Sequence, residues 1–135
     1  MASITDLVLR FSEHERPIGT VLSDDVLLSQ GVAATLKYSG YGVILSRAEQ
    51  IDVFTLLPIP NLPLDETCEL TDSEWAIIRP LFMLYVEREN AVYLEASRGM
   101  GLDVYGRSVS EITGDITQFE MELPKLAFCR GIISI

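Results

Sequence analysis

Residues 105–126, YGRSVSEITGDITQFEMELPKL, decide the fold class of this chain. Apolar side chains recur here at alternating gaps of four and three residues, which places them on one face of a helix. The members of this face are Tyr105, Val109, Ile112, Ile116, Phe119, Leu123 and Leu126. We expect a long amphipathic helix that ends at Arg130 and Gly131. Two starts are open: Asp103, or Ser108, which forms a capping pair with Glu111.

A second long helix is predicted just before this one, over residues 72–98. It opens with Thr71 and Glu74, a capping box in which each side chain accepts a hydrogen bond from the other residue's backbone N–H. Pro80 should kink this helix, and the glycines that follow Arg98 should end it. The loop between the two long helices is short, so we expect them to pack as an antiparallel pair.

The apolar faces of the two long helices are expected to form the core. The residues predicted to be buried are Trp75, Ile78, Phe82, Tyr85, Ile112, Ile116, Phe119 and Leu123. The aromatic members Trp75, Phe82, Tyr85 and Phe119 are candidates either for this core or for a helix face between subunits. The fold class that follows is mainly α, a small helical bundle that forms a single domain over residues 1–135.

Residues 1–57 are predicted to contribute short helices. Capping signals at Ser3 and Ser23 open helices over residues 4–11 and 24–38. The buried residues of the second helix should include Val26, Val32 and Leu36.

Two interpretations compete for residues 43–57. Ser46 and Glu49 form a capping pair that favours a helix, whereas apolar and β-branched runs on either side of residues 47–50 fit two strands around a turn. We favour the helix. Prolines then make residues 58–70 an extended connection, expected to lie across the helices of its own chain or across a neighbouring molecule.

The composition narrows the possible partners. The net charge is −10, from 20 acidic and 10 basic residues, and this argues against tight binding of nucleic acid. Hydrophobic residues make up 48% of the chain, which fits either a leucine-rich core or apolar surface intended for neighbours. Cys68 and Cys129 lack a CxxC spacing, so inert thiols in a reducing compartment are expected. We expect no signal peptide and no membrane span.

The candidate chemical motifs all have simpler explanations. His14 is the single histidine and lies between Glu13 and Glu15, a pattern that fits a solvated polar turn better than a metal or acid–base site. Asp24 and Asp25 are explained by helix capping. We therefore predict no catalytic, metal or cofactor-binding residue, and no enzymatic activity.

The long helices over residues 70–96 and 105–135, together with the short opening helices, resemble the head–tail connector (adaptor or neck) proteins of tailed bacteriophages. The proline-rich residues 57–64 depart from that pattern. The resemblance implies a virion protein, assembled in the host cytoplasm, that forms a homo-oligomeric ring of about twelve copies. It further implies contacts with the portal and with tail or collar proteins, and DNA that passes through the ring without being held tightly.

The last five residues, 131–135, are predicted to be an apolar docking tail. Ile132, Ile133 and Ile135 are β-prone and uncharged, so they should dock onto the portal or a neighbouring copy by strand addition or by filling a groove. Packing back onto their own bundle is the alternative.

Two other functions remain open from the sequence. One is a phage-encoded or cellular helical adaptor or inhibitor whose acidic surface meets a host protein. The other is a bundle that binds a small ligand beside Trp75, Phe82, Tyr85 and Phe119.

Overall fold

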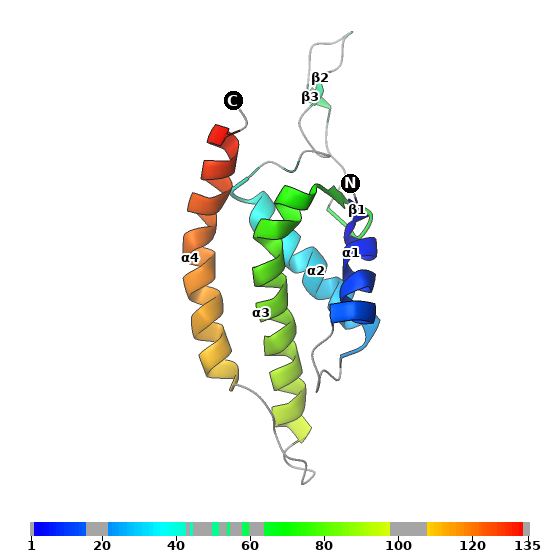
Figure 1. Cartoon of the computed structure of the whole chain (residues 1–135), viewed down its shortest axis with the longest axis vertical. Helices are drawn as coiled ribbons and strands as arrows, with labels where there is room; N and C mark the ends of the chain where they lie inside the picture. Colours follow the sequence, from blue (N-terminus) through cyan, green and yellow to red (C-terminus); the bar gives the residue numbers. More distant parts are fainter. Residues whose placement is uncertain are drawn as a thin grey trace.

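The computed structural model describes residues 2–15, 22–42, 44, 50–51, 54, 58–59, 64–97 and 108–133, with the side chains of 50–51, 58–59, 97 and 128–133 left out. Within these residues the fold is mainly α (Figure 1). The helices are α1 (Ile4–Arg10), α2 (Asp24–Ser39), α3 (Asp72–Ser97) and α4 (Val109–Ile133), and α1 continues into a π-helical turn, η1 (Phe11–Glu15). The predicted small helical bundle with two long C-terminal helices is confirmed.

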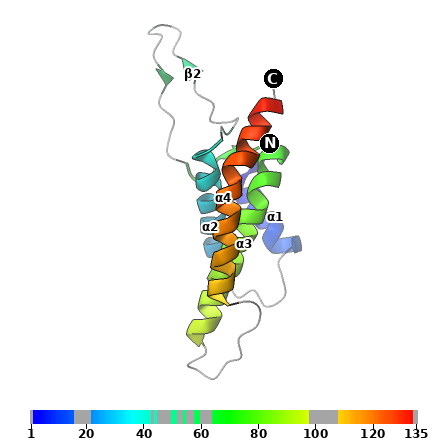
Figure 2. The ribbon, with the colours of Figure 1, turned by 90° about the vertical axis from the view of Figure 1, so that its left-hand side faces the viewer.

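The two long helices lie side by side and run in opposite directions, as the short loop between them predicted (Figures 1 and 2). α3 continues through Pro80, and α4 continues through Gly114 and Pro124. The predicted end of the last helix at Arg130 and Gly131 is wrong, because α4 continues to Ile133. Once a helix is established, each further residue adds one hydrogen bond, so a single glycine near its end costs too little to stop it.

The helix starts follow the capping signals in the sequence. Thr71 and Glu74 form the predicted reciprocal pair: the Thr71 N–H donates to Glu74 Oε1 at 2.9 Å, and the Glu74 N–H donates to Thr71 Oγ1 at 3.2 Å. Single caps open the other three helices, where side-chain oxygens of Ser3, Ser23 and Ser108 accept from the N–H groups of Asp6, Val26 and Glu111 at 3.2, 3.5 and 3.4 Å. Each cap satisfies an N–H that the first turn leaves without a helical partner.

The core lies where α3 meets the other three helices. Phe82 is fully buried and contacts the Phe11 ring edge-on at 5.0 Å between centroids and the tilted Trp75 ring at 5.5 Å. Six of the eight residues predicted to be buried are buried, namely Ile78, Phe82, Tyr85, Ile112, Ile116 and Leu123. Trp75 and Phe119 are half-buried against the same cluster. The four aromatic candidates therefore belong to the core of this chain.

The predicted buried face of α2 is only partly right. Leu36 is 58% exposed, whereas Leu27, Ala34 and Tyr38 are buried. The buried face is set by Gly31, where an added Cβ would lie 2.7 Å from Val8 Cγ2 of α1. The missing side chain lets α1 approach closely, and this contact turns Leu36 outward.

Two short antiparallel strands tie the beginning of α1 to the beginning of α3. β1 (Ala2–Ser3) pairs with β4 (Glu69–Leu70), with Ala2 opposite Leu70. The backbone N–H groups of Ile4 and Thr5 then donate to the carbonyls of Cys68 and Glu66, at 3.0 and 3.1 Å. The end of the predicted extended connection thus supplies acceptors for the first turn of α1.

A second antiparallel pair corrects the interpretation of residues 43–57. β2 (Gln50–Ile51) pairs with β3 (Pro58–Ile59), with Gln50 opposite Ile59. The favoured helix is therefore wrong at β2, and the turn of the alternative hairpin is not at residues 47–50 but beyond β2. Pro58 has no N–H to donate, and a two-stranded ladder has only edge positions, which tolerate proline. The rest of residues 43–57, apart from Ile44 and Phe54, lies outside the described residues.

Candidate interaction surface

A shallow groove of about 430 Å³ opens between the C-terminal half of α2 and the middle of α3. It is lined by Ala33, Leu36, Lys37, Gly40, Tyr41 and Tyr85. Leu36 and Tyr41 are 58% and 46% exposed, so two large apolar side chains of this groove keep much of their surface in water. Lys37 is the one charged side chain among the lining residues. We call this feature the α2–α3 groove.

The Tyr85 side of the groove is held by a polar contact that joins three helices. The Tyr85 hydroxyl of α3 donates to Glu120 Oε1 of α4 at 2.6 Å. Lys37 Nζ of α2 lies 3.8 Å from Glu120 Oε2, and Arg88 stacks over the Tyr85 ring at 5.0 Å. The contact fixes α2 and α4 against α3 and keeps Lys37 at the rim of the groove.

The surroundings of Tyr85 hold its hydroxyl in the neutral form. Burial raises the pKa of Tyr85, the hydrogen bond to Glu120 and the charge of that carboxylate raise it further, and Arg88 lowers it. A neutral phenol can donate to a carboxylate, whereas a phenolate would face it as a second negative charge. Tyr85 is therefore a hydrogen-bond donor at any physiological pH.

We expect Tyr85→Phe to lower the free energy of unfolding at pH 7 by about 1 kcal/mol, because the ring stays buried and only the hydrogen bond is lost. The folded-state pKa is raised, so this contribution is full below the unfolded pKa of about 10 and is lost as the pH rises above it. Urea unfolding from pH 7 to 11 should show the two proteins converging above pH 10. A constant difference over that range would contradict this assignment.

A second groove, of about 480 Å³, lies between α2 and the segment before β4. Its lining residues are Asp25, Leu28, Ser29, Val32, Leu64, Asp65 and Glu66. Asp65 Oδ1 already accepts hydrogen bonds from the N–H and hydroxyl of Thr67, at 2.9 and 2.6 Å. These hydrogen bonds hold the loop at Asp65 in place, so we assign the second groove a structural role.

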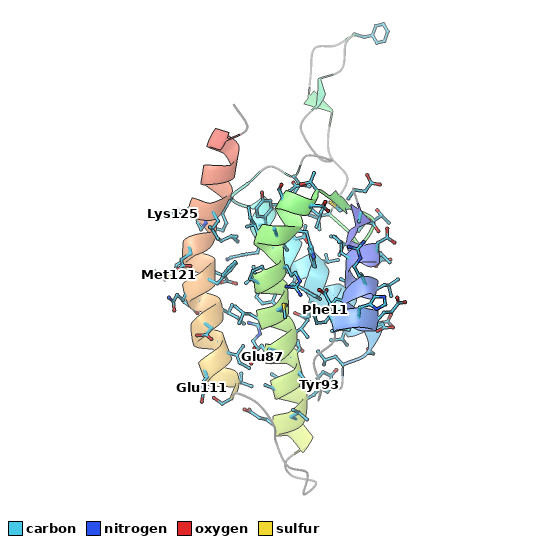
Figure 3. The ribbon with its side chains drawn as sticks, in the orientation of Figure 1. Phe11, Glu87, Tyr93, Glu111, Met121 and Lys125 are labelled. Carbon is cyan, nitrogen blue, oxygen red and sulfur yellow. The ribbon has the colours of Figure 1, made fainter. Side chains whose placement is uncertain are left out.

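The outer face of α4 is polar and mostly acidic. Glu111, Asp115 and Glu122 are exposed there, with Lys125 as the one base among the side chains described for this helix. Met121, 77% exposed, interrupts this face, and Figure 3 shows it and Lys125 pointing away from α3.

The structure places the residues predicted as sites in different surroundings. The helical bundle packs Phe82 and Tyr85 inside, and Tyr85 also borders the α2–α3 groove. Ile132 and Ile133 belong to α4 in this chain, whereas docking by strand addition would require them to be extended. Ile135 lies outside the described residues, and docking of the tail stays a prediction.

The histidine motif lies on the surface, where the sequence placed it. The side chains of His14 and Glu13 are 72% and 69% exposed, and their closest N–O distance is 3.7 Å. Both belong to the π-helical turn η1 rather than to a loop. Across the described part of the chain, His, Cys, Asp and Glu side chains form no group of three or more that could hold a metal ion.

Sequence reasoning missed the α2–α3 groove. The sequence predicts Leu36 to be buried in the helix over residues 24–38, and Tyr41 lies just beyond the predicted end of that helix. The signal that could have found the groove is Gly31, because a glycine inside a helix often marks close packing on its own face.

No known protein family, curated protein or solved structure matches this chain. Among the helices that the structure describes, none is long and apolar enough to cross a membrane.

Proposed function

We propose that this chain is a structural subunit that assembles with copies of itself into a ring, and that the ring is a head–tail connector of a tailed bacteriophage. The observation that carries the proposal is the α2–α3 groove, around which Leu36 and Tyr41 are exposed on a chain with a net charge of −10. Large apolar side chains gathered around a concave surface are typical of sites that another protein covers.

The acidity of the chain supports the connector role in particular. A conduit for DNA works best when its walls repel phosphates, and this chain carries a net charge of −10. The outer face of α4, with exposed Glu111, Asp115 and Glu122, offers such a wall. The ring would join the portal to tail or collar proteins through its two ends.

We expect native mass spectrometry and light scattering to find one discrete oligomer, several times the 15.0 kDa mass of the chain, at micromolar concentration. A chain that stays monomeric or dimeric at all concentrations would contradict the ring. That result would instead favour the adaptor or inhibitor function.

The same preparation tests the conduit. In an electrophoretic mobility-shift assay at moderate salt, we expect no measurable binding of duplex DNA, because phosphates repel a chain with a net charge of −10. Tight binding that weakens steeply with salt would contradict the proposal that the ring repels DNA. It would not affect the proposal that the chain forms an oligomer.

A further inference from the structure

Phe54 is the most exposed large apolar side chain among the described residues. It is 95% exposed and lies in a turn between β2 and β3. Figures 1 and 2 place β2 and β3 beyond the end of the helical bundle, away from the core. A large aromatic side chain gains free energy when another surface takes it out of water.

The α2–α3 groove offers a surface of matching chemistry on the same chain. Its rim is formed by Leu36 and Tyr41, both of which keep about half of their surface in water. Its volume of about 430 Å³ accommodates a phenyl ring between them. Phe54 does not occupy the groove of its own chain, because 95% of its surface is exposed.

We propose that Phe54 of one copy inserts into the α2–α3 groove of a second copy of this chain. The inference rests on the proposed function and names the contact that joins neighbouring subunits. Phe54 serves as the knob, and Leu36 and Tyr41 form the walls that receive it.

Charge complementarity selects a second copy as the occupant. Two chains that each carry −10 repel one another, so a contact between them must be apolar or must place a base opposite an acid. Lys37 is the one charged side chain that lines the groove. In the sequence, the one charged residue between positions 50 and 64 is Asp52, two positions before Phe54.

The knob and the groove occupy different parts of the molecule, so each subunit gives one knob and receives one. In the proposed ring this contact runs head-to-tail around the circle, whereas two copies that exchanged knobs reciprocally would stop at a dimer. An aromatic side chain buries roughly 150–250 Å², while a stable interface needs roughly 800 Å² on each partner. Phe54 is therefore the anchor of a wider interface that the flanking helices complete.

The test uses two variants of the full chain, Phe54→Ser without the knob and Leu36→Asp with a blocked groove. Both positions are exposed, so both proteins should keep the circular dichroism of the wild type, and they should keep its melting temperature where all three are monomeric. Each alone should weaken assembly by about 30-fold or more, as loss of a central anchor does. Leu9→Ser, at a 41% exposed apolar position on α1, is the matched control and should assemble normally.

Mixing the two variants gives the decisive result. One variant keeps an intact groove and the other an intact knob, so a 1:1 mixture should form a heterodimer that grows no further, visible by native mass spectrometry. A wild type that never assembles would overturn the proposed function itself. A wild type that assembles together with both variants, or weakened variants that fail to pair when mixed, would overturn the knob and groove and leave the ring standing.

Discussion

Replacing Phe82 with alanine is expected to lower the free energy of unfolding by about 3–5 kcal/mol. Phe82 is fully buried where α3 meets Phe11 and Trp75, so truncation removes apolar burial and leaves a cavity between two rings. Those rings belong to different elements and cannot both move in to fill the space. Chemical denaturation followed by circular dichroism measures the loss, and the thermal midpoint should fall in parallel.

Phe54→Ala provides the matched control, because it makes the same chemical change at a side chain that is 95% exposed. At a protein concentration where the chain is monomeric, it should change the free energy of unfolding by no more than about 0.5 kcal/mol. Equal losses at the two positions would mean that Phe82 is not at the centre of the core.

Gly31→Ala is expected to destabilise the fold by up to about 2 kcal/mol although it improves the helix propensity of α2. A Cβ at this position would lie 2.7 Å from Val8 Cγ2 and 3.2 Å from Ile4 Cγ2, and both of those residues are buried. Alanine is favoured over glycine inside a helix by about 1 kcal/mol, whereas overpacking a filled core costs about 1–3 kcal/mol. The clash should prevail because α1 would have to move away from α2.

Gly114→Ala should have the opposite sign. Gly114 lies inside α4, and nothing is within 4 Å of the Cβ that alanine would add. We expect a gain of about 0.5–1 kcal/mol from helix propensity alone. Urea titration of both variants beside the wild type measures the contrast, and a gain in stability at position 31 would show that α1 is not packed against Gly31 as described.

The sequence predicted the elements whose signals are local. Serine and threonine caps marked the starts of all four described helices, and the repeating gaps of three and four placed Ile112, Ile116 and Leu123 on the buried side of α4. The sequence predictions failed where contacts between distant segments of the chain decide the structure. Leu36 is exposed because α1 packs on the face of Gly31, and β2 is a strand because Pro58 and Ile59 are at hand to pair with it.

The candidate surface was the least predictable feature. A groove needs two helices whose relative placement is known, and Leu36 and Tyr41 come from α2 and its end while Tyr85 comes from α3. The periodic pattern of a single helix predicts that a leucine on its apolar face is buried. It carries no information on which apolar residues remain exposed once three helices have packed. The absence of a convergent polar motif in the sequence was the observation that favoured an assembly role.

The pairing of β1 with β4 also sets an order of events during synthesis. Residues 2 and 3 leave the ribosome long before residues 69 and 70, yet the first turn of α1 takes its hydrogen bonds from the carbonyls of Cys68 and Glu66. The opening helix must therefore wait for half of the chain to be translated before its first turn is complete. During that interval Ile4 and Val8 of α1 can pack against α2, whose Gly31 lies close to both side chains, and the cover that Phe82 of α3 provides comes later.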